Sequence, residues 1–172
     1  NSTSTSTNKF EQLADSKQKS IIDASVYEFA DKGFKNASVN KIVEKAGISK
    51  GSLFNYFKSK NLLFDHIYAI ALREVKSYLA KVQDESENDD FFTRFGKIIN
   101  SGITFINKHP RLARIYFRLL NSDDSPHGKT IIKNLHSEAI RYLTDFVEVG
   151  IERNELHSEL NPTTVAFLWK VR

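Results

Sequence analysis

The segment from residue 38 to residue 60 constrains this chain more than any other part of its sequence. Two short helical patterns are joined there by a tight turn. Gly47 suits the left-handed backbone conformation that ends a helix. Ser49 can cap the next helix by accepting a hydrogen bond from a free backbone N–H, and Ile48 and Leu53 flank that cap as an apolar pair. The pattern predicts a helix, a sharp turn and a second helix, which is the DNA-reading helix-turn-helix.

The excess positive charge of the chain lies in the same region. Residues 1–60 hold ten lysines and six acidic residues, whereas residues 61–172 balance at fifteen basic and fifteen acidic residues. Between Lys35 and Lys60 there are six lysines, and Glu44 is the one acidic residue. A local field of this kind attracts phosphate backbones. A solvated lysine-rich surface is the alternative interpretation, but the coincidence with a well-marked turn favours DNA.

Composition excludes several other classes of protein. The hydrophobic content of 40% is enough for a real core, and the absence of cysteine excludes disulfides and thiolate chemistry. No apolar run is long enough to span a membrane, and no secretory signal opens the chain, so we expect a cytoplasmic protein with no membrane partner. We find no nucleophile motif or phosphate loop, and therefore expect neither an enzyme nor a cofactor.

Metal binding is not expected either. The five histidines show no metal-ligand spacing on one helix. Asp123, Asp124 and His127 form the one cluster worth considering, and a polar loop is the favoured account of it.

Helical spacing and punctuation predict eight helices and no strand. The expected helices cover 15–32, 38–46, 50–57, 59–84, 91–108, 110–121 and 130–153, and a last one begins at Pro162. The fold class is therefore all-α, with an N-terminal three-helix helix-turn-helix module and a C-terminal helical bundle. We expect a disordered arm at 1–14, a DNA-binding domain at 15–60 and the bundle at 61–172.

The sequence resembles the TetR family of transcriptional regulators. The resemblance is carried by Tyr27 to Phe34, by Ser38-Val39 and by Ile42 to Leu63. Beyond residue 66 the number and order of the helices fit the TetR-like fold. The resemblance implies a ligand-responsive homodimer that binds a palindromic operator in double-stranded DNA and usually represses. A small-molecule effector in the C-terminal bundle usually releases such a regulator.

One departure concerns the ligand-binding and dimerisation domain expected at 61–172. Members of the family normally dimerise through their last two long helices. This sequence stops inside an apolar helical pattern that follows Pro162. We therefore expect the domain to be incomplete at its C-terminus, and the homodimer is an expectation from the family alone. A rival interpretation is a helical interaction adaptor whose helix-turn-helix does not bind DNA.

Candidate DNA contacts gather on the two helices of the turn motif. Gly51 allows close backbone approach, Ser52 or Asn55 can hydrogen-bond base edges, and Phe54 can touch a thymine methyl group. The resemblance implies phosphate contacts for Tyr56 and for Lys60, and the start of the second helix favours an anion. The candidate set is Ser38, Asn40, Ser49, Lys50, Gly51, Ser52, Phe54, Asn55, Tyr56 and Lys60. The alternatives are a solvated Asn55, a core-packed Tyr56 and a Ser38 that only caps its helix.

Aromatic residues on the later helices are the candidates for an effector pocket. They are Phe95, Phe105, Tyr116, Phe117, Tyr142 and Phe146. Their number favours an apolar or aromatic effector, although aromatic residues at helical spacing more often form ordinary core.

Arg111, Arg114 and Arg118 form a stripe along the sixth expected helix. An anion site or a coupling surface against the DNA-binding module is one interpretation. A solvated face with local ion pairs is the favoured one.

Overall fold

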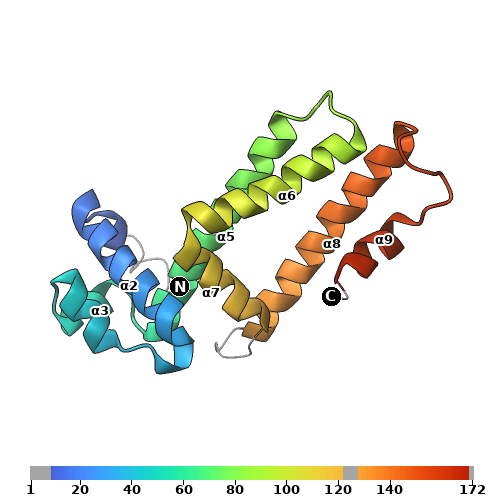
Figure 1. Cartoon of the computed structure of the whole chain (residues 1–172). Coiled ribbons are helices and arrows are strands. Elements are labelled where there is room, and N and C mark those ends of the chain that lie inside the picture. The colour runs from blue at the N-terminus through green and yellow to red at the C-terminus, as the bar shows by residue number, and fades with distance from the viewer. Residues whose placement is uncertain (1–8, 122–127, 171–172) are drawn as a thin grey trace. The chain divides into compact units, whose positions relative to one another are not determined.

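The computed structural model describes residues 9–121 and 128–170. These residues lie in helices or in irregular segments, and there is no strand among them. The all-α prediction is confirmed. The helices are α2 (Asp15–Asn36), α3 (Val39–Ala46), α4 (Lys50–Tyr56), α5 (Lys60–Asp84), α6 (Phe91–Lys108), α7 (Pro110–Asn121), α8 (Gly128–Glu152) and α9 (Pro162–Lys170) (Figure 1). Each lies within a few residues of its expected span.

The chain divides into two compact units. The first, called here the N-terminal unit, comprises residues 1–76 and 105–126, and the C-terminal unit comprises residues 77–104 and 127–172. The helices α5 and α6 therefore contribute to both. This grouping differs from the division expected at residue 60, because α7 packs against α2 and joins the N-terminal unit.

The N-terminal unit is built around α2, which packs against both α3 and α7, while α3 contacts α4. Its core contains Ile21, Phe29 and Ile42, each at most 1% exposed. Gly33 interrupts α2 with φ 71°, and Phe34 then turns back so that its ring lies 5.1 Å from that of Phe64. The glycine predicted to end this helix therefore does change the chain direction, although helical residues continue to Asn36.

The expected disordered arm requires a correction. Residues 1–8 lie outside the described part of the chain, but Phe10 is only 2% exposed. Its ring lies 4.9 Å from that of Phe57 and 5.2 Å from that of His66. Burial of one large aromatic ring offsets the entropy of ordering a short segment. The prediction of disorder to residue 14 missed this contact because the isolated Phe10 has no periodic partner in the sequence.

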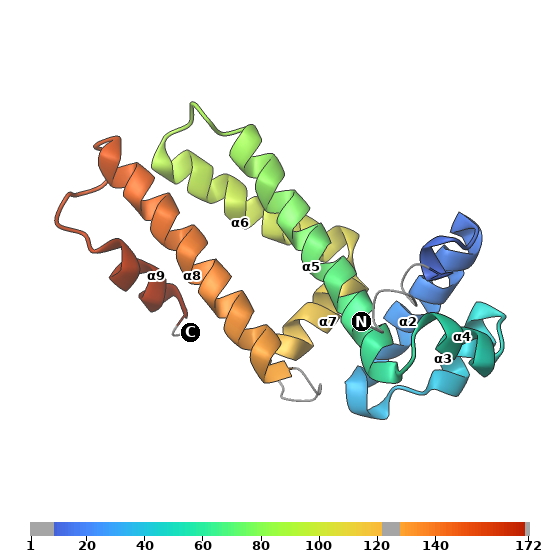
Figure 2. The same ribbon diagram turned by 180° about the vertical axis from the view of Figure 1, so that it is seen from behind.

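The C-terminal unit is formed by the end of α5, by α6 as far as residue 104, and by α8 and α9. In both Figure 1 and Figure 2, α9 lies beside α8, and the two helices are in contact. Asp90 begins α6 by accepting hydrogen bonds from the backbone N–H groups of Phe92 and Thr93, at 2.9 and 3.1 Å. The ring of Phe91 packs 4.7 Å from that of Phe146, which joins α6 to α8.

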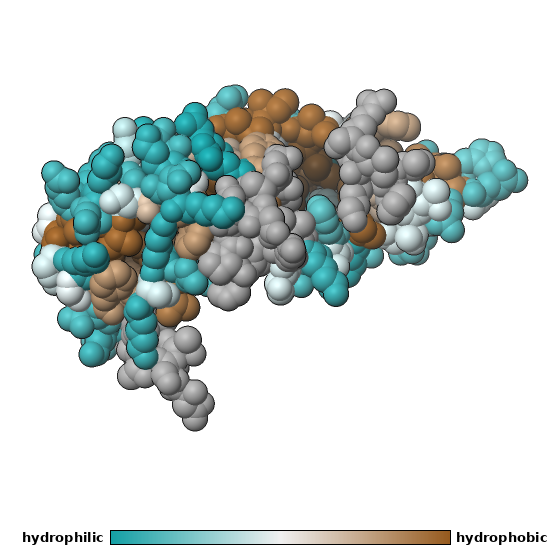
Figure 3. Space-filling view, turned by 90° about the horizontal axis from the view of Figure 1, so that it is seen from below, coloured by the Kyte–Doolittle hydropathy of each residue, from teal (hydrophilic) through white to brown (hydrophobic). Residues whose placement is uncertain are grey.

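Apolar side chains also reach the surface of this chain. The face shown in Figure 3 has brown apolar areas among larger teal ones. The exposed large apolar residues of α6 include Phe92, at 68%, and Ile103, at 51%. Within the described residues, no helix has the length and apolarity needed to cross a membrane.

Candidate functional site

The turn between α3 and α4 has the geometry that its sequence predicts. Gly47 adopts the left-handed conformation, with φ 65° and ψ 38°. The backbone N–H groups of Gly47 and Ile48 donate to the carbonyl oxygens of Glu44 and Val43, at 3.2 and 3.0 Å. These bonds satisfy carbonyl groups that the end of α3 leaves free. The chain therefore leaves α3 sharply and is ready to start α4.

Ser49 then caps α4. Its hydroxyl oxygen accepts from the backbone N–H of Ser52 at 3.0 Å, and the two serine hydroxyl oxygens lie 2.8 Å apart. The predicted cap is confirmed. Because the Ser52 hydroxyl can turn outward or toward Ser49, it can exchange this contact for one to a base edge or a phosphate.

Two buried side chains, Leu53 and Phe57, fix which face of α4 points outward. Leu53 is 1% exposed and Phe57, which follows the helix, is 5% exposed, as predicted for the inner face. On the other side Lys50, Gly51 and Asn55 are exposed. A short helix with its apolar residues held inside and small or polar residues outside is suited to a major groove.

The start of α3 carries two of the candidate residues. Ser38 caps the helix, since its hydroxyl oxygen accepts from the backbone N–H of Lys41 at 3.4 Å. The backbone N–H of Ser38 itself donates to the Glu28 carboxylate at 2.9 Å. Asn40 is exposed in the first turn. Capping thus accounts for the Ser38 hydroxyl in this structure, while Asn40 points to solvent.

Glu28 is a site residue that the sequence analysis missed. It is only 6% exposed and holds the connection between α2 and α3 in place through Ser38. A carboxylate placed in an otherwise apolar stretch of α2 is the signal that marks it, because a buried carboxylate requires a donor.

The two candidate phosphate ligands differ in their surroundings. Tyr56 is half-exposed, and its ring meets that of Phe10 edge-on at 6.3 Å. The Lys60 ammonium donates to the carbonyl oxygen of Lys35 at 3.1 Å and lies 4.8 Å from the ring centre of Phe34. Partial burial lowers the pKa of Lys60. An ammonium has three donors, so Lys60 can keep the contact to Lys35 and still hold a phosphate.

The six candidate effector residues fall in different parts of the chain. Phe105, Tyr116 and Phe117 belong to the N-terminal unit, and Phe117 is 45% exposed. Phe95, Tyr142 and Phe146 belong to the C-terminal unit. Of these, Tyr142 and Phe146 line a pocket of about 500 Å³.

That pocket, called here the C-terminal pocket, has an apolar wall and a polar one. Ile98 and Val149 accompany the aromatic rings on the apolar wall. Arg94 also lines it, 5.2 Å from the ring centre of Phe146, and pairs with Glu155 at 3.3 Å. The arrangement suits an amphiphilic molecule better than a purely apolar one.

Two polar atoms at this pocket are buried without a hydrogen-bond partner among the described residues. They are the Ser86 hydroxyl oxygen and Arg94 Nε. An unsatisfied buried donor costs free energy, which a ligand that accepts from it recovers. Ser86 and Arg94 are not among the predicted site residues, because nothing in the spacing of a single serine and a single arginine marks them as neighbours. Burial also raises the pKa of Tyr142, so its hydroxyl stays a donor at neutral pH.

The arginine stripe of α7 lies along α2. Arg118 Nη2 donates to the carbonyl oxygen of Asp31 at 3.1 Å, and the Arg111 guanidinium lies 5.1 Å from the ring centre of Tyr27. Arg114 and Arg118 add to the lowered pKa of Asp31, whose main cause is its hydrogen bond with Lys32. The favoured prediction of a solvated face is incomplete, since the exposed stripe also contacts α2 of the predicted DNA-binding module.

Metal ligation finds no support among the described side chains, where no group of three or more His, Asp or Glu residues is placed to hold an ion. The cluster of Asp123, Asp124 and His127 lies outside the described residues.

Comparison with known proteins agrees with this geometry. Residues 21–67 match the family model "Bacterial regulatory proteins, tetR family". The chain is 27% identical to the HTH-type transcriptional regulator YdgC of Bacillus subtilis, over 87% of this chain and 73% of that protein. It is 26% identical to the HTH-type transcriptional repressor KstR2 of Rhodococcus jostii, over 87% of this chain and 59% of KstR2.

A solved structure is similar over almost the whole chain. It is a TetR family transcriptional regulator from Chloroflexus aurantiacus, with a TM-score of 0.74 and 28% sequence identity. The superposition covers 96% of this chain and 75% of that protein.

Proposed function

We propose that this chain, which belongs to the TetR family of bacterial regulatory proteins, is a repressor that binds a palindromic operator as a homodimer and is released by a small molecule. Its family makes it a helix-turn-helix regulator of transcription. The observation that carries the proposal is the Ser49-capped helix α4, whose outer face presents Lys50, Gly51 and Asn55.

DNA recognition follows from two kinds of contact. Ser52 and Asn55 are suited to base edges in the major groove, and Phe54 to a thymine methyl group. Tyr56 and Lys60 are suited to phosphates, which set the register but carry no sequence information. Ser38 and Asn40, at the start of α3, add a helix N-terminus to the phosphate contacts. Repression is the role of the relative KstR2, as its name states.

The C-terminal pocket is the proposed effector site. Its apolar wall would hold the body of the molecule against Phe146, and its polar wall would donate from Arg94 and Ser86. We therefore infer an effector that has an apolar or aromatic body and at least one hydrogen-bond acceptor.

Release of DNA is proposed to involve α5. This helix starts at Lys60, directly after the DNA-reading unit, and its last residues, Val82 to Asp84, line the C-terminal pocket. Half-sites one turn of DNA apart are about 34–36 Å from centre to centre, so a small tilt of α5 in each subunit of a dimer would misplace the reading helices. Linkage requires that operator DNA weaken effector binding by the same factor.

Selection from random DNA duplexes, followed by a salt titration, tests the DNA-binding proposal. We expect enrichment of a palindrome and a steep loss of affinity with salt. Flat, weak binding without enrichment would contradict it and favour the interaction adaptor. For the release step, equal effector affinity with and without operator would contradict the model.

A further inference from the structure

A second opening, separate from the C-terminal pocket, lies within the N-terminal unit. It is a groove of about 530 Å³ formed by α2, α3, α5 and the junction of α6 with α7. We call it the Tyr27 groove, after the aromatic residue that lines it. Ile22 and Val26 supply apolar lining, and the basic side chains at the groove are Lys45, Lys108 and Arg111.

Two of these cations contact the same aromatic ring. Lys45 Nζ lies 3.1 Å from the centre of the Tyr27 ring, and the Arg111 guanidinium lies 5.1 Å from it. Lys45 belongs to α3 and Arg111 to α7, so cations from two helices converge here. A ring face attracts a cation only weakly at an exposed site. The ring is therefore a modest partner that an anion can readily replace.

The carboxylates near the groove do not neutralise these cations. Asp23 lines the groove, but it pairs with Lys19 at 2.6 Å. Glu74 lies 4.0 Å from His109, which carries a positive charge only when protonated. Within the described part of the chain, no carboxylate lies in ion-pair distance of Lys45, Lys108 or Arg111. Among the described residues, these three cations therefore have no carboxylate as a direct partner.

The start of α7 adds to this field. Pro110, Arg111 and Leu112 all line the groove and form the first turn of a twelve-residue helix. Pro110 has no N–H, but the backbone N–H groups of Arg111 and Leu112 have no partner within the helix, and the helix dipole places partial positive charge there. The dipole and the three basic side chains therefore act on the same space.

We propose that the Tyr27 groove binds a small phosphate monoester. A dianionic phosphate would accept charge-assisted hydrogen bonds from Lys45 and Arg111, with Lys108 close by, and these bonds are stronger than the cation–π contacts they replace. The organic part of the ester would lie over Ile22 and Val26. This site is distinct from the proposed effector and DNA contacts, and the proposal does not depend on either of them.

Titration of the full chain with inorganic phosphate and with adenosine 5′-monophosphate tests the proposal. The readouts are calorimetry and the NMR signals of the Tyr27 ring, assigned with Tyr27→Phe. We expect saturable binding that shifts these signals, because the phosphate draws cations away from the ring. Acetate at matched ionic strength should produce no such shift. Absence of saturable binding by both phosphates would overturn the proposal.

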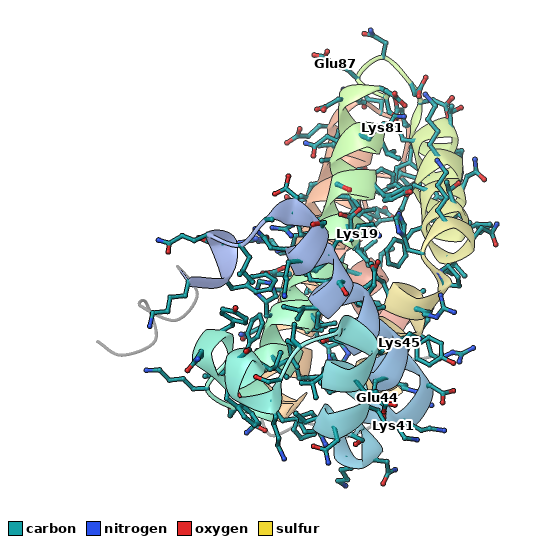
Figure 4. The ribbon with its side chains drawn as sticks, turned by 90° about the vertical axis from the view of Figure 1, so that its left-hand side faces the viewer. Lys19, Lys41, Glu44, Lys45, Lys81 and Glu87 are labelled. Carbon is teal, nitrogen blue, oxygen red and sulfur yellow. The ribbon has the colours of Figure 1, made fainter. Side chains whose placement is uncertain are left out.

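A matched pair of variants distinguishes a specific phosphate site from general electrostatic attraction of phosphate to the basic surface. Lys41 and Lys45 both project from α3 (Figure 4), but only Lys45 lines the groove. We expect the double variant Lys45→Gln, Arg111→Gln to weaken phosphate binding by about tenfold or more, because two charge-assisted hydrogen bonds are lost. Lys41→Gln should leave it within about twofold, as expected for an exposed surface charge outside the groove. Equal weakening by Lys41→Gln would overturn the proposal.

The last measurement is the salt dependence of binding to a DNA duplex of arbitrary sequence. The double variant should keep the salt slope of the wild-type protein, since the proposal assigns the cations to a small ligand. A slope reduced by about one per lost charge, together with no phosphate binding, would instead assign them to the DNA backbone.

Discussion

Arg118 of α7 donates a hydrogen bond to the backbone carbonyl oxygen of Asp31 in α2, at 3.1 Å. A β-carbon added at Gly33 would lie only 3.1 Å from Nη1 of the same guanidinium. Gly33 also has φ 71°, a conformation that L side chains rarely adopt. The end of α2 is thus shaped for a close approach by an arginine that lies 85 residues further along the chain.

This contact predicts unequal effects of two neighbouring arginines. We expect Arg118→Ala to lower the free energy of unfolding by about 1 kcal/mol or less, the usual net value of one hydrogen bond at an exposed position. Arg114→Ala, on the same helix, loses no such bond and should change stability less. Urea unfolding followed by circular dichroism measures both, and equal effects would show that charge alone matters here.

The two faces of α4 predict that one substitution weakens DNA binding without loss of stability and that another lowers stability. Asn55→Ala should weaken operator binding by about 1–3 kcal/mol, the range for a good base contact, and leave the free energy of unfolding within about 0.5 kcal/mol. Leu53→Ala should instead cost about 2–5 kcal/mol of stability, because Leu53 is 1% exposed and its removal leaves a cavity. Fluorescence anisotropy with labelled operator and urea unfolding measure the two effects. Undiminished affinity in Asn55→Ala would remove this residue from the base contacts.

The surroundings of two helical glycines predict that replacement by alanine changes stability in opposite directions. A β-carbon at Gly150 would lie 2.7 Å from Phe91 Cδ2 and 2.9 Å from Leu156 Cδ1. Apart from the backbone of its own helix, none of the described residues comes within 4 Å of one at Gly102. Gly102→Ala should therefore stabilise the protein by about 0.5–1 kcal/mol through helix propensity. Gly150→Ala should destabilise it by about 1 kcal/mol, because overpacking exceeds that gain. A rise in melting temperature for both variants would show that the residues packed against α8 at this point rearrange at little cost in free energy.

The surroundings of His66 predict a pH dependence of stability. Burial is the main cause that lowers the pKa of His66 below its usual 6.5, and a nearby Arg73 adds to it. The unfolded chain therefore binds a proton more readily than the folded one, and His66 should destabilise the fold as pH falls through 6.5 toward the lowered pKa. Urea unfolding at a series of pH values should show this loss in the wild-type protein and a smaller one in His66→Gln. The exposed His157, changed in the same way, is the control.

Local signals in the sequence determined the helices and the turn motif. Gly47 and Ser49 act on their own backbone neighbours, so residue type alone places the end of α3 and the start of α4. The periodic apolar positions likewise marked Leu53 and Phe57 as core residues. These features depend on interactions within a few residues, which a linear sequence displays directly.

Tertiary structure decided the contacts between residues far apart in the chain. Phe10 is buried only because the rings of Phe57 and His66 are brought beside it. The polar wall of the C-terminal pocket combines Ser86 and Arg94 with Tyr142 of α8, and no local pattern in the sequence links these residues. The basic side chains of the Tyr27 groove come from α3, α6 and α7. The physical reason is that helix propensity and capping are local energies, whereas packing and the convergence of charge depend on where the folded chain brings its helices together.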